Sequence, residues 1–156
     1  MTNLQNIPIL LRREIEALIT APLIKAYIEE FGEEKALAVA KKVVAAAARQ
    51  SGLMMREAAG GVSLEHLIEV FNVFRQGGAL EIEHIETTDK SAAFNVTRCR
   101  YAEMYKEHGL EKFGGLLSCS RDFDLFAVFN PKIKFTRTKT IMEGCDHCDF
   151  RFELEE

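Results

Sequence analysis

The chain has 156 residues, of which 47% are hydrophobic and 28% charged, proportions that are ordinary for a soluble globular protein. The formal net charge is −4 and no block of basic residues is present, which argues against nucleic acid as a partner. No apolar run approaches the ~20 residues of a membrane span, and the N-terminus lacks the pattern of a signal peptide. We therefore expect a cytoplasmic protein without a membrane partner, in which the four cysteines are thiols or ligands rather than disulfides.

Helical periodicity dominates the first half of the chain. Residues 7–31 are the first predicted helix, with a break expected at Pro22 because proline removes a backbone donor and clashes with the preceding turn. A second helix is predicted over residues 33–49, and Gly52 is expected to end it. Its alanine-rich sequence permits close approach of another helix, either within the subunit or across a homodimer interface. Ser63 is the predicted N-cap of a third helix.

The second half of the chain alternates between strand and helix patterns. Two strands, two helical stretches and two further strands are predicted in the order 79–87, 91–97, 98–108, 110–129, 132–138 and 148–154. The length of the chain predicts one domain, with a helical part over residues 1–77 and a part that carries the sheet and the site over residues 78–156. The order of elements predicts an α+β fold. Its four-stranded antiparallel sheet is built from two hairpins and covered by N-terminal and central helices.

Four cysteines, at positions 99, 119, 145 and 148, stand next to charged or polar residues. A cysteine in such a setting can be a nucleophile whose thiolate is favoured by a neighbouring Arg or His, with a carboxylate to orient the site. Cys145 and Cys148 have the spacing of a metal half-site or a redox pair. Free cysteines are also common as small buried hydrophobic residues. Phosphoryl and hydride transfer are disfavoured, because the sequence has no phosphate-binding loop or dinucleotide fingerprint.

Five motifs follow one another in the second half: Val96-Thr-Arg-Cys-Arg-Tyr-Ala-Glu-Met-Tyr105, Leu117-Ser-Cys-Ser-Arg-Asp122, Phe129-Asn-Pro131, Arg137-Thr-Lys-Thr140 and Gly144-x-x-x-Cys-Asp-Phe150. In this combination the chain resembles the L-2-amino-thiazoline-4-carboxylic acid hydrolase family. Its closing Gly-x-x-x-Cys-x-Phe is more distantly similar to the end of four-vinyl-reductase small-molecule-binding domains. The additional cysteine of their zinc pattern corresponds to Thr140 here, so no metal is expected.

The resemblance implies a hydrolase of a small cyclic amidine, in which water adds to the ring carbon between nitrogen and sulfur and yields a carbamoyl-cysteine. The carboxylate of such a substrate requires an arginine, and its amidinium carbon requires a nucleophile or an activated water. The partner is then a small-molecule substrate, and no cofactor is expected. The expected catalytic residues are Cys119, Asp122, His147 and Cys148, and the expected substrate-binding residues are Arg98, Cys99 and Arg137.

The alternative function is a sensor of the four-vinyl-reductase type, which holds a small molecule or a metal without turnover. If the protein is a sensor, we expect a larger cavity that is lined by Phe94, Phe113, Phe126 and Phe150 and has no convergent polar groups. The hydrolase predicts instead that Cys119, Asp122 and Cys148 meet in one pocket, with at least one of them accessible to solvent. A redox protein, the third possibility, predicts that Cys145 and Cys148 are exposed and that their thiols have shifted pKa values.

Overall fold

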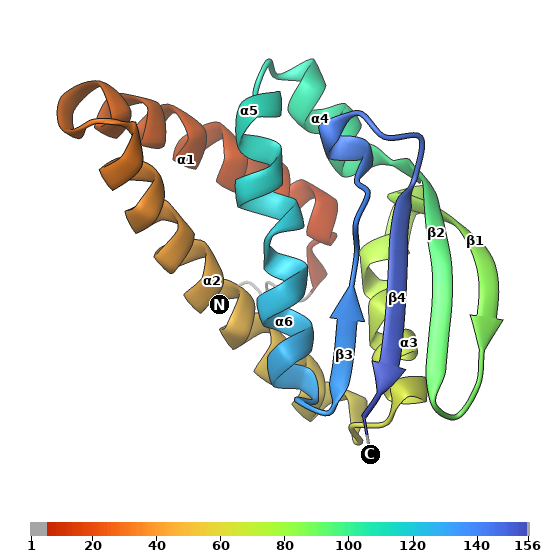
Figure 1. Ribbon diagram of the computed structural model, residues 1–156. Helices are drawn as coiled ribbons and strands as arrows, with labels where there is room; N and C mark the ends of the chain where they lie inside the picture. Colours follow the sequence, from red (N-terminus) through yellow and green to blue (C-terminus); the bar gives the residue numbers. More distant parts are fainter. Residues whose placement is uncertain (1–5, 156) are drawn as a thin grey trace.

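The computed structural model describes residues 6–155 and places a group of helices beside a four-stranded sheet (Figure 1). The helices are α1 (Ile9–Phe31), α2 (Glu33–Ala59), α3 (Leu64–Phe71), α4 (Arg100–Glu107), α5 (Glu111–Gly114) and α6 (Arg121–Phe129). The strands are β1 (Leu80–Thr87), β2 (Ser91–Cys99), β3 (Ile133–Thr136) and β4 (Cys148–Leu154). All neighbouring strands are antiparallel, in the order β1-β2-β4-β3. The predicted α+β fold is therefore confirmed.

The alternating pattern of the strands gives the sheet one buried face. In β4, Cys148, Phe150 and Phe152 are buried, whereas Glu153 is exposed. Phe94 of β2 pairs with Phe150, and the centroids of their stacked rings are 5.1 Å apart. Helices α3 and α6 cover this face and complete the core with Leu64, Leu67, Phe71, Leu125, Phe126 and Phe129. The strand alternation thus carries Cys148 into the edge of the core.

Two local predictions in the middle of the chain have different outcomes. Ser63 caps α3 as predicted, because its side chain accepts a hydrogen bond from the backbone N–H of His66. Strand β2 extends to Cys99, two residues beyond the predicted end, and α4 begins only at Arg100. The extension is held by pairing of Leu80 with Cys99 across the hairpin.

The predicted break at Pro22 is wrong, since α1 continues through it to Phe31. Proline frees the carbonyl of Leu18, but Leu18 is 47% exposed and that carbonyl lies on the solvent side of the helix. On the opposite side, Ala17, Ala21 and Ile24 are buried in a core shared with α2 and α4. Burial on one side and water on the other let the helix tolerate the proline.

The predicted end of α2 at Gly52 is also wrong, since α2 continues to Ala59. A Cβ at position 52 would lie 2.5 Å from the carbonyl oxygen of Leu125 and 2.5 Å from Cγ2 of Val128. Gly52 therefore permits α2 and α6 to touch, and Gly60 in the left-handed region ends the helix. Within residues 6–155, no helix is both long and apolar enough to cross a membrane.

Candidate functional site

A cavity of about 70 Å³ lies where α1, the turn before α6 and the buried face of the sheet meet. One water needs roughly 10–15 Å³, so the cavity has room for roughly five waters or one compact small molecule. Apolar side chains such as Phe71, Phe74 and Phe150 form much of its wall. Its charged and thiol-bearing lining residues are Arg13, Cys99, Cys119, Arg121, Asp122, Arg137 and Cys148.

Five of the residues expected from the sequence line this one cavity. They arrive from separate elements: Cys99 ends β2, Cys119 ends the π turn over residues 115–119, and Asp122 lies in the first turn of α6. Arg137 follows β3, and Cys148 begins β4. Because β2 and β3 both pair antiparallel with β4, the C-terminal ends of β2 and β3 lie beside the start of β4, at one end of the sheet.

Arg98 and His147 lie outside the cavity. The Arg98 side chain is half exposed and forms ion pairs with Glu81 at 3.2 Å and Glu103 at 2.8 Å. Nδ1 of His147 lies 2.8 Å from a carboxylate oxygen of Asp146 in the loop before β4. Arg98 precedes Cys99 in strand β2, and neighbouring strand residues point to opposite faces of the sheet.

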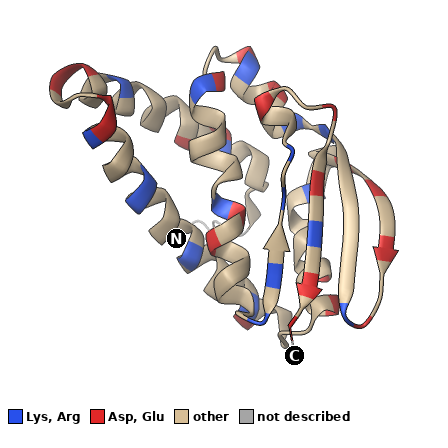
Figure 2. Ribbon diagram, viewed as in Figure 1, with Lys and Arg blue, Asp and Glu red and all other residues tan. Residues whose placement is uncertain are grey.

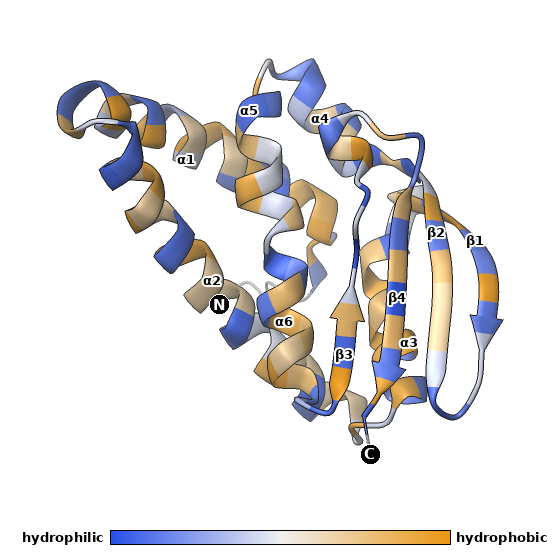
Figure 3. Cartoon of the chain, in the orientation of Figure 1, coloured by the Kyte–Doolittle hydropathy of each residue, from blue (hydrophilic) through white to orange (hydrophobic). Residues whose placement is uncertain are grey.

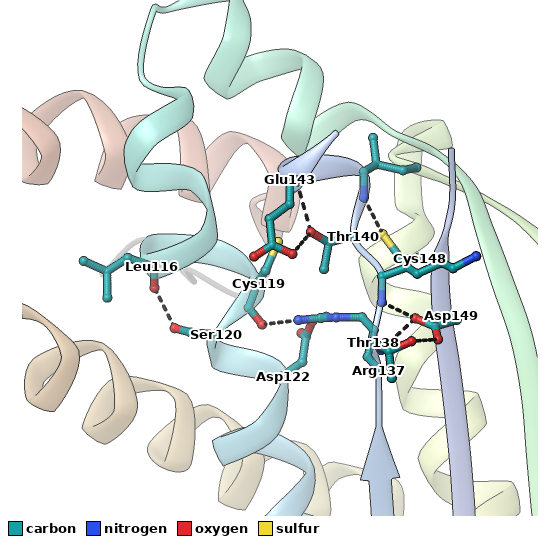
Figure 4. A network of polar contacts seen from close by, with 12 residues as sticks. Leu116, Cys119, Ser120, Asp122, Arg137, Thr138, Thr140, Glu143, Cys148 and Asp149 are labelled. Atoms are coloured by element: carbon teal, nitrogen blue, oxygen red, sulfur yellow. Dashed lines mark hydrogen bonds and ion pairs between the residues drawn. The ribbon is translucent and has the colours of Figure 1, made fainter. Parts of the chain in front are cut away.

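Arg137 is held by the protein and in turn orients Asp122 (Figure 4). Its Nη1 donates to Oδ2 of Asp122, and its Nη2 donates to the carbonyl oxygen of Cys119 at 2.9 Å. Only 4% of the Arg137 side chain is exposed. Its guanidinium carbon also lies 5.2–5.7 Å from the centroids of three aromatic rings, those of Phe123, Phe135 and Phe150. These contacts hold the guanidinium of Arg137 in position against the carboxylate of Asp122.

The three cavity thiols are protonated at neutral pH. Burial raises the pKa of Cys99 to about 11, and burial with the negative charge of Asp122 raises the pKa of Cys119 further. Burial also raises the pKa of Cys148, although its sulfur accepts a hydrogen bond of 3.2 Å from the backbone N–H of Ile141. A thiolate nucleophile is therefore absent from the resting site.

Asp122 is the one carboxyl group in the lining of this cavity. Burial raises its pKa above the usual range, and the charges of Arg137, Arg121 and Arg13 oppose that rise only in part. Arg137 keeps its charge: burial lowers its pKa, but Asp122 and Cys119 more than offset this. A carboxylate with a raised pKa is a stronger base than an ordinary aspartate.

Two arginines that sequence reasoning did not assign complete the charge balance of the cavity. Arg13 comes from α1 and forms an ion pair with Glu16. Burial, followed by repulsion from Arg13, lowers the pKa of Arg121 to about 10. The cavity lining thus contains three arginines and one carboxyl group, and Arg13 also pairs with Glu16 outside the lining. Arg121 lies within a motif that the sequence did single out, whereas nothing local in the sequence marked Arg13.

The loop that carries Arg137 is fixed by Asp149, whose side chain lies on the face of β4 opposite to Cys148 and Phe150. Carboxylate oxygens of Asp149 accept hydrogen bonds from the backbone N–H of Thr138 at 2.8 Å and of Lys139 at 2.6 Å. Burial opposes the charge on Asp149, but these hydrogen bonds lower its pKa overall. No group of three or more His, Cys, Asp or Glu side chains between residues 6 and 155 is arranged to hold a metal ion.

The family model of L-2-amino-thiazoline-4-carboxylic acid hydrolase matches residues 12–152. The chain belongs to this family. A search of curated proteins finds no match to the chain. Among solved structures, the phenol-responsive sensory domain of the transcription activator PoxR, with phenol, is similar at a TM-score of 0.56 and 11% sequence identity. The likeness covers 88% of this chain and 74% of that chain. At this identity it concerns the fold alone.

The lining of the cavity in this member of the L-2-amino-thiazoline-4-carboxylic acid hydrolase family differs from that expected of a sensor. Of the four phenylalanines that the sensor predicts in the wall, Phe150 alone is among its lining residues. Polar groups converge instead. The exposure expected of a redox pair is not met either, because Cys148 is 6% exposed and packs in the core.

Proposed function

We propose that this member of the family is a hydrolase that opens a small cyclic amidine bearing a carboxylate, of the 2-amino-thiazoline-4-carboxylate type. The observation that carries the proposal is the convergence of Asp122 with three thiols and three arginines on one small cavity. A site that only holds an apolar ligand has no use for buried charges, which cost free energy unless they are paired. Family membership supports the reaction class.

The charges of the cavity match the two charged ends of such a substrate. An amidine is cationic at neutral pH and forms a charge-assisted pair with a carboxylate, here Asp122. Arg121 lines the cavity and donates no hydrogen bond to any residue between 6 and 155, so its guanidinium is available to the substrate carboxylate. Arg13 adds a second positive charge on the same side. The substrate carboxylate would then lie beside the arginines, and the amidinium beside Asp122.

Asp122 is the proposed base. Its Oδ2 accepts from Arg137, and its Oδ1 has no hydrogen-bond donor among residues 6–155. In the proposed step, Oδ1 takes a proton from water as the water oxygen bonds to the ring carbon between nitrogen and sulfur. The ring C–S bond of this tetrahedral adduct then breaks, the proton passes from Asp122 to the leaving sulfur, and the hydroxyl group on the former ring carbon becomes the carbamoyl C=O as the proton that the cationic amidine carried is released to solvent. The product therefore differs from the substrate by one water.

Cys119 and Cys148 line the same cavity as neutral thiols. An alternative route, in which Cys119 attacks the ring carbon, requires Asp122 to remove the thiol proton first. Burial raises the pKa of that thiol, so forming the thiolate that this route needs costs more than it would for an exposed cysteine. The two routes differ in what removal of the thiol does to turnover.

The experiment follows ring opening of 2-amino-thiazoline-4-carboxylate by mass spectrometry, as the gain of one water. Loss of a general base costs ~10²–10⁴-fold in rate, so Asp122→Asn should lose at least ~100-fold. Cys145→Ala is the matched control because Cys145 does not line the cavity, and it should retain full activity. An active, folded Asp122→Asn variant would overturn the role of Asp122. An equal loss in Cys119→Ala would transfer the attack to the thiol.

A sensor without turnover is the second candidate, and the fold shared with a sensory domain favours it. In that case the same compound would raise the melting temperature of the protein without any product being formed. We also place the protein in the cytoplasm, because all four cysteines are free and free thiols suit a reducing compartment.

A further inference from the structure

A continuous ridge of exposed hydrophobic side chains follows the outer side of α1. Its members recur every four residues, and the most exposed, Ile19 at 67%, stands in the middle. Residues three or four apart are neighbours on a helix surface, so these side chains form one row. The row consists of Leu11, Ile15, Ile19, Leu23, Tyr27 and Phe31, each between 44% and 67% exposed.

Helix α1 is apolar on both of its sides. The inner side packs Ala17, Ala21 and Ile24 into the subunit, and the ridge occupies the outer side. No residue from Ala17 to Ile24 is charged, and the middle of α1 is free of blue and red in Figure 2. Hydrophobic residues recur along the whole helix in Figure 3. A stretch of helix that is free of charge all round, as residues 17–24 are, belongs in a buried position, so its outer side requires a partner.

We propose that this ridge is a homodimer interface in which the α1 helices of two copies pack antiparallel across a two-fold axis at Ile19. The spacing of the ridge is the same on either side of Ile19. A two-fold axis there places Ile15 against Leu23 of the second copy, with Leu11 and Tyr27 at the margins of the contact because each four-residue step turns by about 40° around the helix. Such self-complementarity is what an isologous interface requires. Two four-residue ridges interdigitate when helices cross at about −50°.

The charges at the two ends of α1 favour the antiparallel arrangement. Near the start of the helix, Arg12 and Arg13 are balanced by Glu14 and Glu16, whereas Lys25, Glu29 and Glu30 leave one negative charge near its end. An antiparallel pair keeps the two acidic ends apart and aligns the helix dipoles in opposite directions. A parallel pair would bring Glu29 and Glu30 of both copies together.

The apolar area is on the scale that a dimer needs. A fully exposed large aliphatic side chain presents ~60–120 Å², so the half-exposed ridge together with Leu18 offers on the order of 300 Å². A stable interface buries ~800 Å² on each partner, of which ~65% is apolar in homodimers. The ridge supplies more than half of that apolar share. Val39 and Val43 of α2, exposed by 59% and 64%, add to it.

The mass of the protein in solution tests the proposal, by light scattering after size exclusion over a wide range of concentration. The expected species is a dimer of the 17.6-kDa chain. Ile19→Glu places two carboxylates against each other at the axis and should raise the dimer dissociation constant by ~100-fold or more. Ile85→Glu is the matched control, since Ile85 is 50% exposed on β1, and should remain dimeric. A monomeric wild-type protein, or a dimeric Ile19→Glu variant, would overturn the proposal.

The antiparallel register is tested by introducing opposite charges at two positions that face each other across the axis. Ile15→Lys alone and Leu23→Glu alone should each weaken the dimer, whereas the double variant should restore it because the two positions face each other across the axis. In a parallel dimer the double variant would remain monomeric, which would refute the register. Circular dichroism at equal concentration tests whether each variant is folded. Because Ile15, Ile19 and Leu23 are exposed, their substitution should change the stability of the monomer little.

Discussion

Replacement of Arg137 by methionine tests whether the buried ion pair tunes Asp122. The change removes the two hydrogen bonds of the guanidinium and its charge, while a long aliphatic side chain still fills the space between the phenylalanine rings. Breaking a buried pair costs ~3–5 kcal/mol because the remaining charge is uncompensated. Since 24% of the Asp122 side chain is accessible, we expect the lower end, ~3 kcal/mol. For a chain of this size that lowers Tm by roughly 6–12 °C.

The sign of the pH dependence distinguishes this mechanism from a simple packing defect. Without Arg137, whose charge and hydrogen bond hold it down, the pKa of Asp122 rises further. A carboxyl group whose folded-state pKa is raised stabilises the protein below its unfolded pKa and ceases to do so as pH rises through the folded value. The stability deficit of Arg137→Met should therefore shrink as the pH falls.

The rate of ring opening by the same variant should depend on pH in a defined direction. A base must be deprotonated to act, so the acid limb of the pH–rate profile should move to higher pH. Arg137→Lys is the comparison: it keeps the positive charge and should leave the limb near its original position. An unchanged acid limb in a folded Arg137→Met variant would refute Asp122 as the base.

Three further predictions concern other parts of the structure. Gly52→Ala should destabilise the protein by ~1 kcal/mol in urea denaturation, because overpacking against α6 exceeds the gain in helix propensity; Gly115→Ala, with open space around it, should not. Asp149→Asn should cost ~1 kcal/mol at neutral pH, a difference that vanishes as acid protonates Asp149 in the wild type, since its folded-state pKa is lowered. Arg121→Gln should raise KM for the carboxylate substrate by ~10–100-fold and leave that for its carboxamide analogue unchanged. Equal effects on both compounds would contradict the assigned contact.

The sequence predicts well those features that depend on a local period. The alternation from Cys148 to Leu154 predicted both the last strand and its buried face, and the structure confirms it. Pro22 and Gly52 were interpreted wrongly as the ends of helices because local rules omit tertiary packing. Pro22 lies on the solvent side of its helix, and Gly52 lies where α6 approaches closely.

The positions of Arg98 and His147 outside the cavity depend on where the strands end. Strand β2 extends to Cys99, so Arg98 and Cys99 point to opposite faces of the sheet, whereas the sequence predicted a helix at these residues. His147 lies in the loop before β4, where no period defines the direction of a side chain. Arg13 was beyond local reasoning, because its approach to Arg121 depends on how α1 packs against α2 and α4.

The charges in the cavity, more than the fold, restrict what the site can bind. One fold serves many functions, and the likeness to a sensory domain leaves the chemistry open. An uncharged ligand would displace water from Arg121 and Asp122 without replacing its hydrogen bonds, which costs free energy at each group. A compact ligand with one cationic and one anionic end satisfies both groups. Asp122→Asn should therefore weaken binding of the amidine end, and Arg121→Gln should weaken binding of the carboxylate end. Calorimetry with a carboxamide analogue and an amine-free analogue can separate the contributions of the two ends to the binding free energy.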